Sequence, residues 1–167
     1  MQPDGLPLPN QSEPLPIYTI GHSNHPIDAL IGLLEKHAIE LLVDVRSNPY
    51  SRHAPQANRE SMALALTEAG IVYRWMGERL GGKPQGVVAD YDVLRTSPAF
   101  RDGIRELVLE AAQHRIAIMC AEGDHRQCHR YGLITPELVD RNLRVLHIQP
   151  DGSLVDEESV PTQLRLV

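Results

Sequence analysis

The sequence predicts an α/β protein, with an open, mainly parallel sheet of about five strands and helices on both faces, as in Rossmann-like or flavodoxin-like three-layer sandwiches. Short runs of β-branched and aliphatic residues alternate with segments whose apolar residues recur at helical spacing. This order favours parallel strands, because each crossover helix returns the chain to the same end of the sheet. The 167 residues, 42% of them hydrophobic, suffice for one domain with a buried core.

The expected elements follow one another along most of the chain. Strand composition occurs at residues 17–20, 41–45, 71–75, 116–120 and 144–148. Helical spacing occurs at residues 26–37 with Pro26 in the first turn, 62–69 closed by Gly70, 98–114, and 125–142 with a break or kink at Pro136.

The predicted organisation is a single α/β domain over residues 17–155 between two tails, 1–16 and 156–167. The first tail contains five prolines and little apolar periodicity, which is typical of an extended, disordered segment. The Leu80-Gly81-Gly82-Lys83 stretch within the domain predicts a flexible turn.

Composition excludes several classes of protein. No apolar run approaches the ~20 residues that cross a bilayer, which excludes a membrane protein. The N-terminus lacks the features of a secretory signal, so we expect a cytoplasmic protein whose 2 cysteines are reduced thiols. The formal charge of −6, the 4% aromatic content and the dispersed arginines argue against nucleic-acid binding. The helical faces leave room for a homodimer.

Polar side chains follow three of the predicted strands. They are His22 and Ser23, then Arg46, then Glu122 directly after Cys120. Since ligands bind at the carboxyl ends of parallel strands, we expect these residues to converge on one edge and to bind a small anionic molecule. Asp44 and Arg46 alternate with valines and so point to one face, as part of the pocket or as an ion pair that braces the sheet.

Residues 120–130 hold both cysteines and the densest group of reactive side chains. Asp124 and Gln127 resemble a capping box, which places Cys128 in the first turn of a helix, where a thiolate is favoured. One interpretation is a cysteine nucleophile, because Cys120 and Arg126 have the spacing of the anion cradle in cysteine phosphatases. The carboxylates of the same loop count against it, because they would repel a phosphate.

Three other interpretations remain open for this segment. Cys120, Cys128 and His129, with His22 or His125, could form a zinc site, although their spacing matches no zinc-finger or ribbon pattern. Glu122 could be a general acid or base whose proton affinity is set by nearby arginines and burial, with the thiols lining the pocket. Both cysteines could instead be small buried apolar residues.

Several motifs occur together: Tyr-Thr-Ile-Gly-His-Ser at 18–23, Val-Asp-Val-Arg at 43–46 with Pro49, Leu-Gly-Gly at 80–82, Cys-x-Glu at 120–122, Cys-His-Arg at 128–130, and His-Ile and Asp-Gly at 147–148 and 151–152. In this combination the chain resembles the bacterial family called domain of unknown function 488 over residues 17–152. The resemblance implies an α/β fold and no assigned reaction. It marks as family motif positions His22, Ser23, Asp44, Arg46, Cys120, Glu122, Cys128, His129 and Arg130.

The leading hypothesis is a small enzyme, a hydrolase or a transferase, acting on a phosphate-bearing or nucleotide-like molecule. Cys120, Glu122 and His129 form its catalytic group, in which Glu122 and His129 move protons and Cys120 is the nucleophile or part of the wall. The expected substrate-binding residues are His22, Ser23, Asp44, Arg46, Cys128 and Arg130, with no metal assigned and no cofactor identified. The alternative is a noncatalytic ligand-binding module or a thiol-based sensor.

Overall fold

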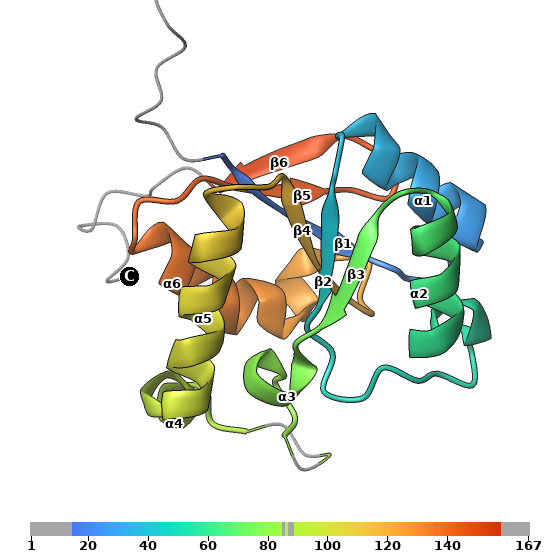
Figure 1. Cartoon of the computed structure of the whole chain (residues 1–167). Coiled ribbons are helices and arrows are strands. Elements are labelled where there is room, and N and C mark those ends of the chain that lie inside the picture. The colour runs from blue at the N-terminus through green and yellow to red at the C-terminus, as the bar shows by residue number, and fades with distance from the viewer. Residues whose placement is uncertain (1–14, 85, 87–88, 158–167) are drawn as a thin grey trace, which may run out of the picture.

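The fold is built on one six-stranded sheet, taken here from a computed structural model that describes residues 15–84, 86 and 89–157 (Figure 1). The strands are β1 (Ile17–Gly21), β2 (Leu41–Asp44), β3 (Val72–Trp75), β4 (Ile116–Cys120), β5 (Val145–Ile148) and β6 (Leu154–Glu157). Their order is β3-β2-β4-β1-β5-β6, and β6 alone is antiparallel to its neighbour. The predicted α/β class is confirmed, and the antiparallel strand β6 was not predicted.

Helices connect these strands. They are α1 (Ile27–Lys36), α2 (Arg59–Glu68), α3 (Gly77–Leu80), α4 (Tyr91–Thr96), α5 (Pro98–Ala111) and α6 (Thr135–Val139). Two short 3₁₀ helices, η1 (Pro55–Ala57) and η2 (His125–Gln127), and a π-helix, η3 (Arg130–Ile134), complete the described part. None of the helices formed by the described residues combines the length and apolar character needed to cross a bilayer.

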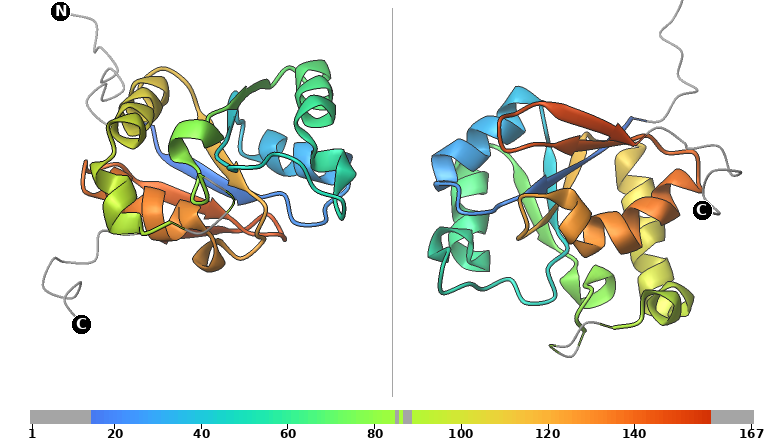
Figure 2. Two further views of the ribbon diagram at one scale, coloured as in Figure 1. Left: turned by 90° about the horizontal axis from the view of Figure 1, so that it is seen from below. Right: turned by 180° about the vertical axis from the view of Figure 1, so that it is seen from behind.

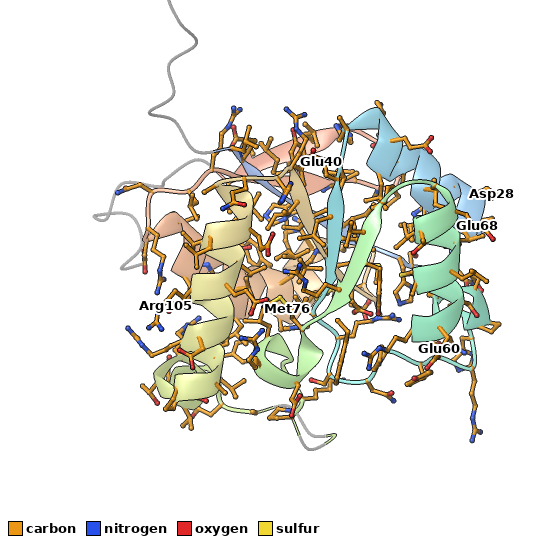
Figure 3. All side chains as sticks on the ribbon, viewed as in Figure 1. Asp28, Glu40, Glu60, Glu68, Met76 and Arg105 are labelled. Carbon is orange, nitrogen blue, oxygen red and sulfur yellow. A yellow bond between two sulfur atoms is a disulfide. The ribbon has the colours of Figure 1, made fainter. Side chains whose placement is uncertain are left out.

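The sheet separates two apolar cores (Figures 1 and 2). Leu42 on β2 packs with α1 and α2 on one face, whereas Val43 packs with α5 and α6 on the other. This division follows from the strand backbone, since successive side chains point to opposite faces. Figure 3 shows Met76 near the middle of the molecule, with Asp28 and Arg105 at its periphery.

The connections change face within the sheet. The chain after β1 and β2 passes through α1 and α2, whereas the chain after β3 and β4 passes through α5 and α6. Strand β4 lies between β2 and β1, so its exit loop diverges from both neighbouring loops. Such a divergence opens a crevice at the carboxyl edge of the sheet, which is where ligands bind in open α/β folds.

The predicted long helix over residues 125–142 is broken at Cys128, between η2 and a helical segment in which η3 runs directly into α6. Cys128 has an extended backbone, with φ −128° and ψ 152°, and ends η2. Thr135 then donates a hydrogen bond from its hydroxyl to the Arg130 carbonyl over 2.6 Å, within the wide turn of η3. Pro136 lies in the first turn of α6, where a missing N–H costs nothing. The placement of Cys128 in the first turn of a helix is therefore wrong.

The predicted tails lie largely beyond the described part of the chain. Positions 1–14 and 158–167 fall outside the described residues, and β6 runs to Glu157.

Candidate functional site

A pocket of about 730 Å³ lies at the carboxyl edge of the sheet, where the loops after β2 and β4 diverge. Five predicted site residues line it: Arg46, Cys120, Glu122, Cys128 and His129. The rest of the wall includes polar groups that the sequence analysis did not select, among them Ser47, Asn48, Lys83 and Gln127. A pocket of this size accommodates a small organic molecule.

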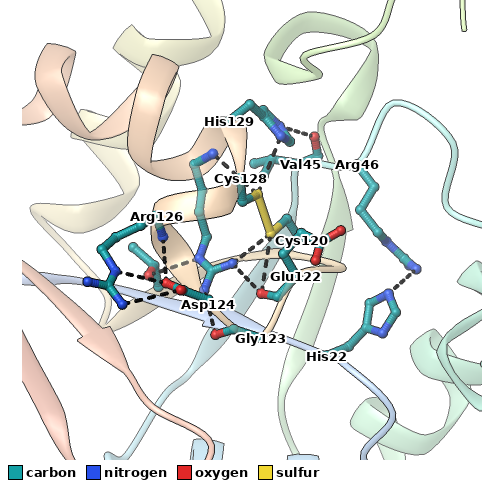
Figure 4. The surroundings of a disulfide bond; sticks show 12 residues. His22, Val45, Arg46, Cys120, Glu122, Gly123, Asp124, Arg126, Cys128 and His129 are labelled. Atoms are coloured by element: carbon teal, nitrogen blue, oxygen red, sulfur yellow. Dashed lines mark hydrogen bonds and ion pairs between the residues drawn. A yellow bond between two sulfur atoms is a disulfide. The ribbon is translucent and has the colours of Figure 1, made fainter. Parts of the chain in front are cut away.

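The two cysteines form a disulfide on the pocket wall (Figure 4). The sequence analysis expected two reduced thiols, whereas the structure pairs the two sulfur atoms. Cys120 ends β4 and is 2% exposed, whereas Cys128 is partly exposed beyond η2. They meet because the chain turns back over the end of β4 after the Glu122-Gly123-Asp124 loop.

The guanidinium of Arg130 lies behind the disulfide and is fully buried. It donates hydrogen bonds from Nη1 to the Cys120 sulfur over 2.6 Å and to the Glu122 carbonyl over 2.7 Å, and from Nε to the Thr19 hydroxyl over 3.2 Å. Burial lowers the pKa of Arg130 to about 10, so the group is still charged at neutral pH. Among the described residues no carboxylate forms an ion pair with it within 4.0 Å.

Arg126 does not take part in this arrangement. Its side chain is 71% exposed and pairs with Asp124 at 3.1 Å, in a bidentate contact (Figure 4). The phosphatase-like interpretation requires this arginine to face the Cys120 sulfur, so that interpretation is wrong. Arg130 reaches the sulfur instead, because the turn at Cys128 folds the following π-helix back over β4.

His129 contacts both the loop after β2 and Cys128. Its Nε2 lies 2.9 Å from the Val45 carbonyl, which only accepts, so Nε2 carries the proton. Burial lowers the pKa of His129, although the hydrogen bond to Val45 acts in the opposite direction. The neutral ring therefore presents the lone pair of Nδ1 to the Cys128 sulfur, 3.6 Å away.

Asp44 and Arg46 form a buried ion pair on the face of the sheet that α1 and α2 cover. Arg46 donates to the Asp44 carboxylate from Nε over 2.9 Å and from Nη2 over 2.7 Å. It also donates to the Ala57 carbonyl over 2.8 Å, and Tyr73 donates to the same carboxylate over 2.5 Å. Burial and the Asp44 charge raise the pKa of the Tyr73 hydroxyl. The two residues thus form an ion pair, and Arg46 also lines the pocket.

His22 completes this second cluster. Its Nδ1 donates to the Ser23 carbonyl over 2.8 Å, and its Nε2 accepts from Arg46 Nη1 over 3.1 Å. Burial lowers the pKa of His22, the Ser23 carbonyl raises it, and the Arg46 charge lowers it further. The hydrogen bonds and the charge both require a neutral ring, so His22 positions Arg46.

The remaining predicted residues are close to solvent. Glu122 is exposed on the pocket wall, and Ser23 is exposed outside it. Three of the residues considered as zinc ligands are otherwise occupied, because Cys120 and Cys128 bond to each other and His129 hydrogen-bonds to Val45.

Two functional contacts escaped the sequence analysis. Thr19 reaches Arg130 and Tyr73 reaches Asp44, both from strands. For Thr19 the available signal was a hydroxyl between two apolar strand neighbours.

Gly81 and Gly82 allow close packing beside the pocket and are not simply a flexible turn. A Cβ at Gly81 would collide with Ser47, and one at Gly82 would lie 2.9 Å from the His129 Cβ. Both glycines are buried. The absent side chains let the end of α3 lie against His129 and the loop after β2.

Comparison with known proteins identifies the family. No curated protein and no solved structure matches the chain. A family model described as "Domain of unknown function DUF488" matches residues 26–135, which hold β2–β4, the disulfide and Arg130. This match covers three of the six strands and all of the residues that line the pocket. The chain therefore belongs to the DUF488 family.

Proposed function

We propose that this protein carries out thiol–disulfide exchange, with Cys120 and Cys128 as a reversible redox pair and a low-molecular-weight disulfide as the substrate. The observation that carries the proposal is the buried Arg130 guanidinium, whose Nη1 donates to the Cys120 sulfur. A buried cation with no carboxylate in contact with it is costly, because the more distant charges of Asp124 and Glu122 offset its desolvation only in part. A Cys120 thiolate in the reduced protein supplies an opposite charge in contact with it.

Arg130 makes Cys120 a good leaving group. A nearby cation lowers the pKa of a thiol, and disulfides break fastest when the departing sulfur is a stable thiolate. Cys120 is also almost inaccessible, with 2% of its surface exposed. These properties suit the cysteine that attacks the mixed disulfide, or that leaves when the internal disulfide is reduced. They do not suit the cysteine that attacks the substrate.

Cys128 has the properties of the attacking cysteine. It is partly exposed on the pocket wall, and the Nδ1 lone pair of His129 lies 3.6 Å from its sulfur. The backbone N–H of Arg130 also points to this sulfur over 3.5 Å. A base and a donor next to one sulfur are the arrangement that activates a thiol.

The exchange balances in two steps. In the dithiol state His129 Nδ1 accepts the proton of the Cys128 thiol, and the resulting thiolate attacks one substrate sulfur. The substrate S–S bond breaks, Cys128 enters a mixed disulfide, and the first substrate thiol leaves with the proton from His129. The Cys120 thiolate then attacks the Cys128 sulfur and expels the second substrate thiolate. The two cysteines lose two electrons, which reduce the substrate to one thiol and one thiolate, and the thiolate takes its proton from solvent.

Binding of a phosphate-bearing substrate, the leading hypothesis from sequence, has less support. Arg46 and Arg130 were to hold the anion, but Arg46 is paired with Asp44 and Arg130 is buried. One observation keeps hydrolase or transferase chemistry as a second candidate: exposed Lys83 and Glu122 both line the pocket. This candidate predicts thermal stabilisation by phosphorylated metabolites that Lys83→Gln abolishes, and turnover that Glu122→Gln abolishes.

The proposed exchange is tested by trapping its intermediate with oxidised glutathione as the probe. Cys120→Ser should accumulate glutathione on Cys128, because the resolving thiol is missing. Cys128→Ser should react at least about tenfold more slowly, because Cys120 is buried. Intact-mass spectrometry of both variants over time measures the two rates.

The wild-type protein, first reduced, should pass through the mixed disulfide to the internal disulfide. Glu122→Gln serves as a matched pocket variant and should react like the wild type. Faster modification of Cys120 than of Cys128, or no modification of either thiol, would overturn the assignment.

A further inference from the structure

Two histidines and a glutamate converge beneath β5 and β6, away from the pocket wall. His125 begins η2, His147 lies in β5 and Glu157 ends β6, and one ligand atom from each falls within 4.8 Å of the other two. His147 Nε2 lies 3.3 Å from Glu157 Oε1, and His125 Nε2 lies 3.9 Å from the same oxygen. None of the three belongs to the thiol centre or to the nine residues selected from sequence.

His147 is the strongest sign of a ligand at this cluster. Its side chain is fully buried, and its Nε2 has no hydrogen-bond partner. The other ring nitrogen lies 2.6 Å from the Thr19 hydroxyl, whose oxygen also accepts from Arg130 Nε. A hydrogen bond at one nitrogen that aims the other at an ion is the usual second shell of a metal-binding histidine.

The separation of the His147 and Glu157 atoms fits tetrahedral coordination. Zinc binds histidine nitrogen and carboxylate oxygen at about 2.0–2.2 Å, so two such ligands at a tetrahedral angle are about 3.4 Å apart. The 3.3 Å between Nε2 and Oε1 matches this edge. When Nδ1 of His147 carries the ring proton, the Nε2 lone pair faces the Glu157 carboxylate and the two repel each other. A cation between them would attract both groups.

His125 has to adjust when an ion binds. Its ring stacks on that of His147, with centroids 3.9 Å apart and planes at 6°, so the in-plane lone pairs run parallel and do not meet. Binding of one ion by both imidazoles therefore requires the His125 ring to turn out of this stack. Gln149 Nε2, now 3.3 Å from His125 Nδ1, must present its amide oxygen to that nitrogen instead.

We propose that His125, His147 and Glu157 bind one divalent transition-metal ion, with zinc as the ion that suits two imidazoles and a carboxylate. Three protein ligands leave a fourth position for water. The ion would connect the edge strand β6 to the loop after β4. The proposed thiol–disulfide exchange does not require this ion.

The site is tested by titrating Zn²⁺ into the full-length, chelator-treated protein against a coloured chelator, with the disulfide intact. We expect about one equivalent to bind, and Glu157→Gln and His125→Gln each to weaken binding by at least about 100-fold. His114→Gln, at an exposed histidine, should bind like the wild type. The Cys120→Ser/Cys128→Ser double variant should also keep its equivalent.

Circular dichroism of the two ligand variants shows whether they are folded, and the softer Glu157→Asp should bind with intermediate affinity. The proposal is overturned if the wild type binds no stoichiometric zinc, if both ligand variants bind it unchanged, or if the double cysteine variant loses it.

Discussion

The arginine that contacts the Cys120 sulfur is Arg130 and not Arg126. The sequence places Arg126 at the phosphatase-like distance from Cys120, yet Arg126 pairs with Asp124 in solvent and Arg130 donates to the sulfur. The difference arises at Cys128, whose extended backbone separates η2 from the helical segment that holds Arg130. The direction of the chain after such a break depends on one residue's φ and ψ, which neither spacing nor helical periodicity predicts.

His22 predicts a pH dependence of stability. Its pKa is lowered in the folded protein, mainly by burial, from an ordinary value of 6.5, so the unfolded chain binds the proton more tightly. The contribution of a neutral His22 is therefore fully present above that value and is lost as the pH falls below it. Denaturant unfolding at pH 7.5 and 5.5 should show a smaller loss of stability in His22→Gln than in the wild type.

His114→Gln is the control for this comparison. The exposed His114 should leave the loss of stability between the two pH values unchanged, while other buried histidines contribute equally to all three proteins. Equal losses in His22→Gln and the wild type would show that the His22 pKa does not change on folding.

At the scale of elements, strands were easier to predict than the segment between β4 and β5. Each of the five predicted strands overlaps an observed one, because continuous β-branched and aliphatic runs identify buried parallel strands. Strand β6 was missed because Leu154–Glu157 ends in two carboxylates and is half exposed. The helix predicted after Asp124 is present from Arg130 to Val139, and the break at Cys128 was not predicted.

The position of residues after strands identified most of the candidate site residues. It did not predict which of these residues lie together in the structure. His22, Asp44 and Arg46 cluster on the α1/α2 face, whereas Cys120 and Arg130 cluster on the other face of the sheet. Period-2 alternation relates residues within one strand and leaves open how loops from different strands cross the edge.

Gly21 joins β1 to the loop after β4 and gives a prediction at this scale. A Cβ at Gly21 would fall against the Glu122 carbonyl oxygen, which already accepts from Arg130. Gly21→Ala should therefore destabilise the protein by about 1–3 kcal/mol and change Cys120 reactivity. Gly32, in α1, has open space around its Cα, so Gly32→Ala should be stabilising by about 0.5–1 kcal/mol.

Chemical denaturation of both alanine variants measures these changes. Equal stability of Gly21→Ala and the wild type would mean that the two loops do not pack as closely as described.

At the scale of the whole molecule, two features combine. The connections of the sheet diverge around β4, and two buried arginines have partners of different kinds. One buried arginine, Arg46, has a carboxylate partner, whereas Arg130 has a sulfur. The fold places that sulfur at the pocket, because Cys120 ends the strand between the diverging loops. The proposed exchange chemistry depends on this position and on the charge behind it.

The most direct test of the account is the pKa of the Cys120 thiol, measured in Cys128→Ser from the pH dependence of iodoacetamide alkylation. We expect a value well below the ordinary ~8.5, which Arg130→Gln raises by at least about one unit and the matched Arg126→Gln leaves unchanged. An ordinary thiol pKa that neither arginine affects would contradict the claim that Arg130 holds Cys120 as a thiolate.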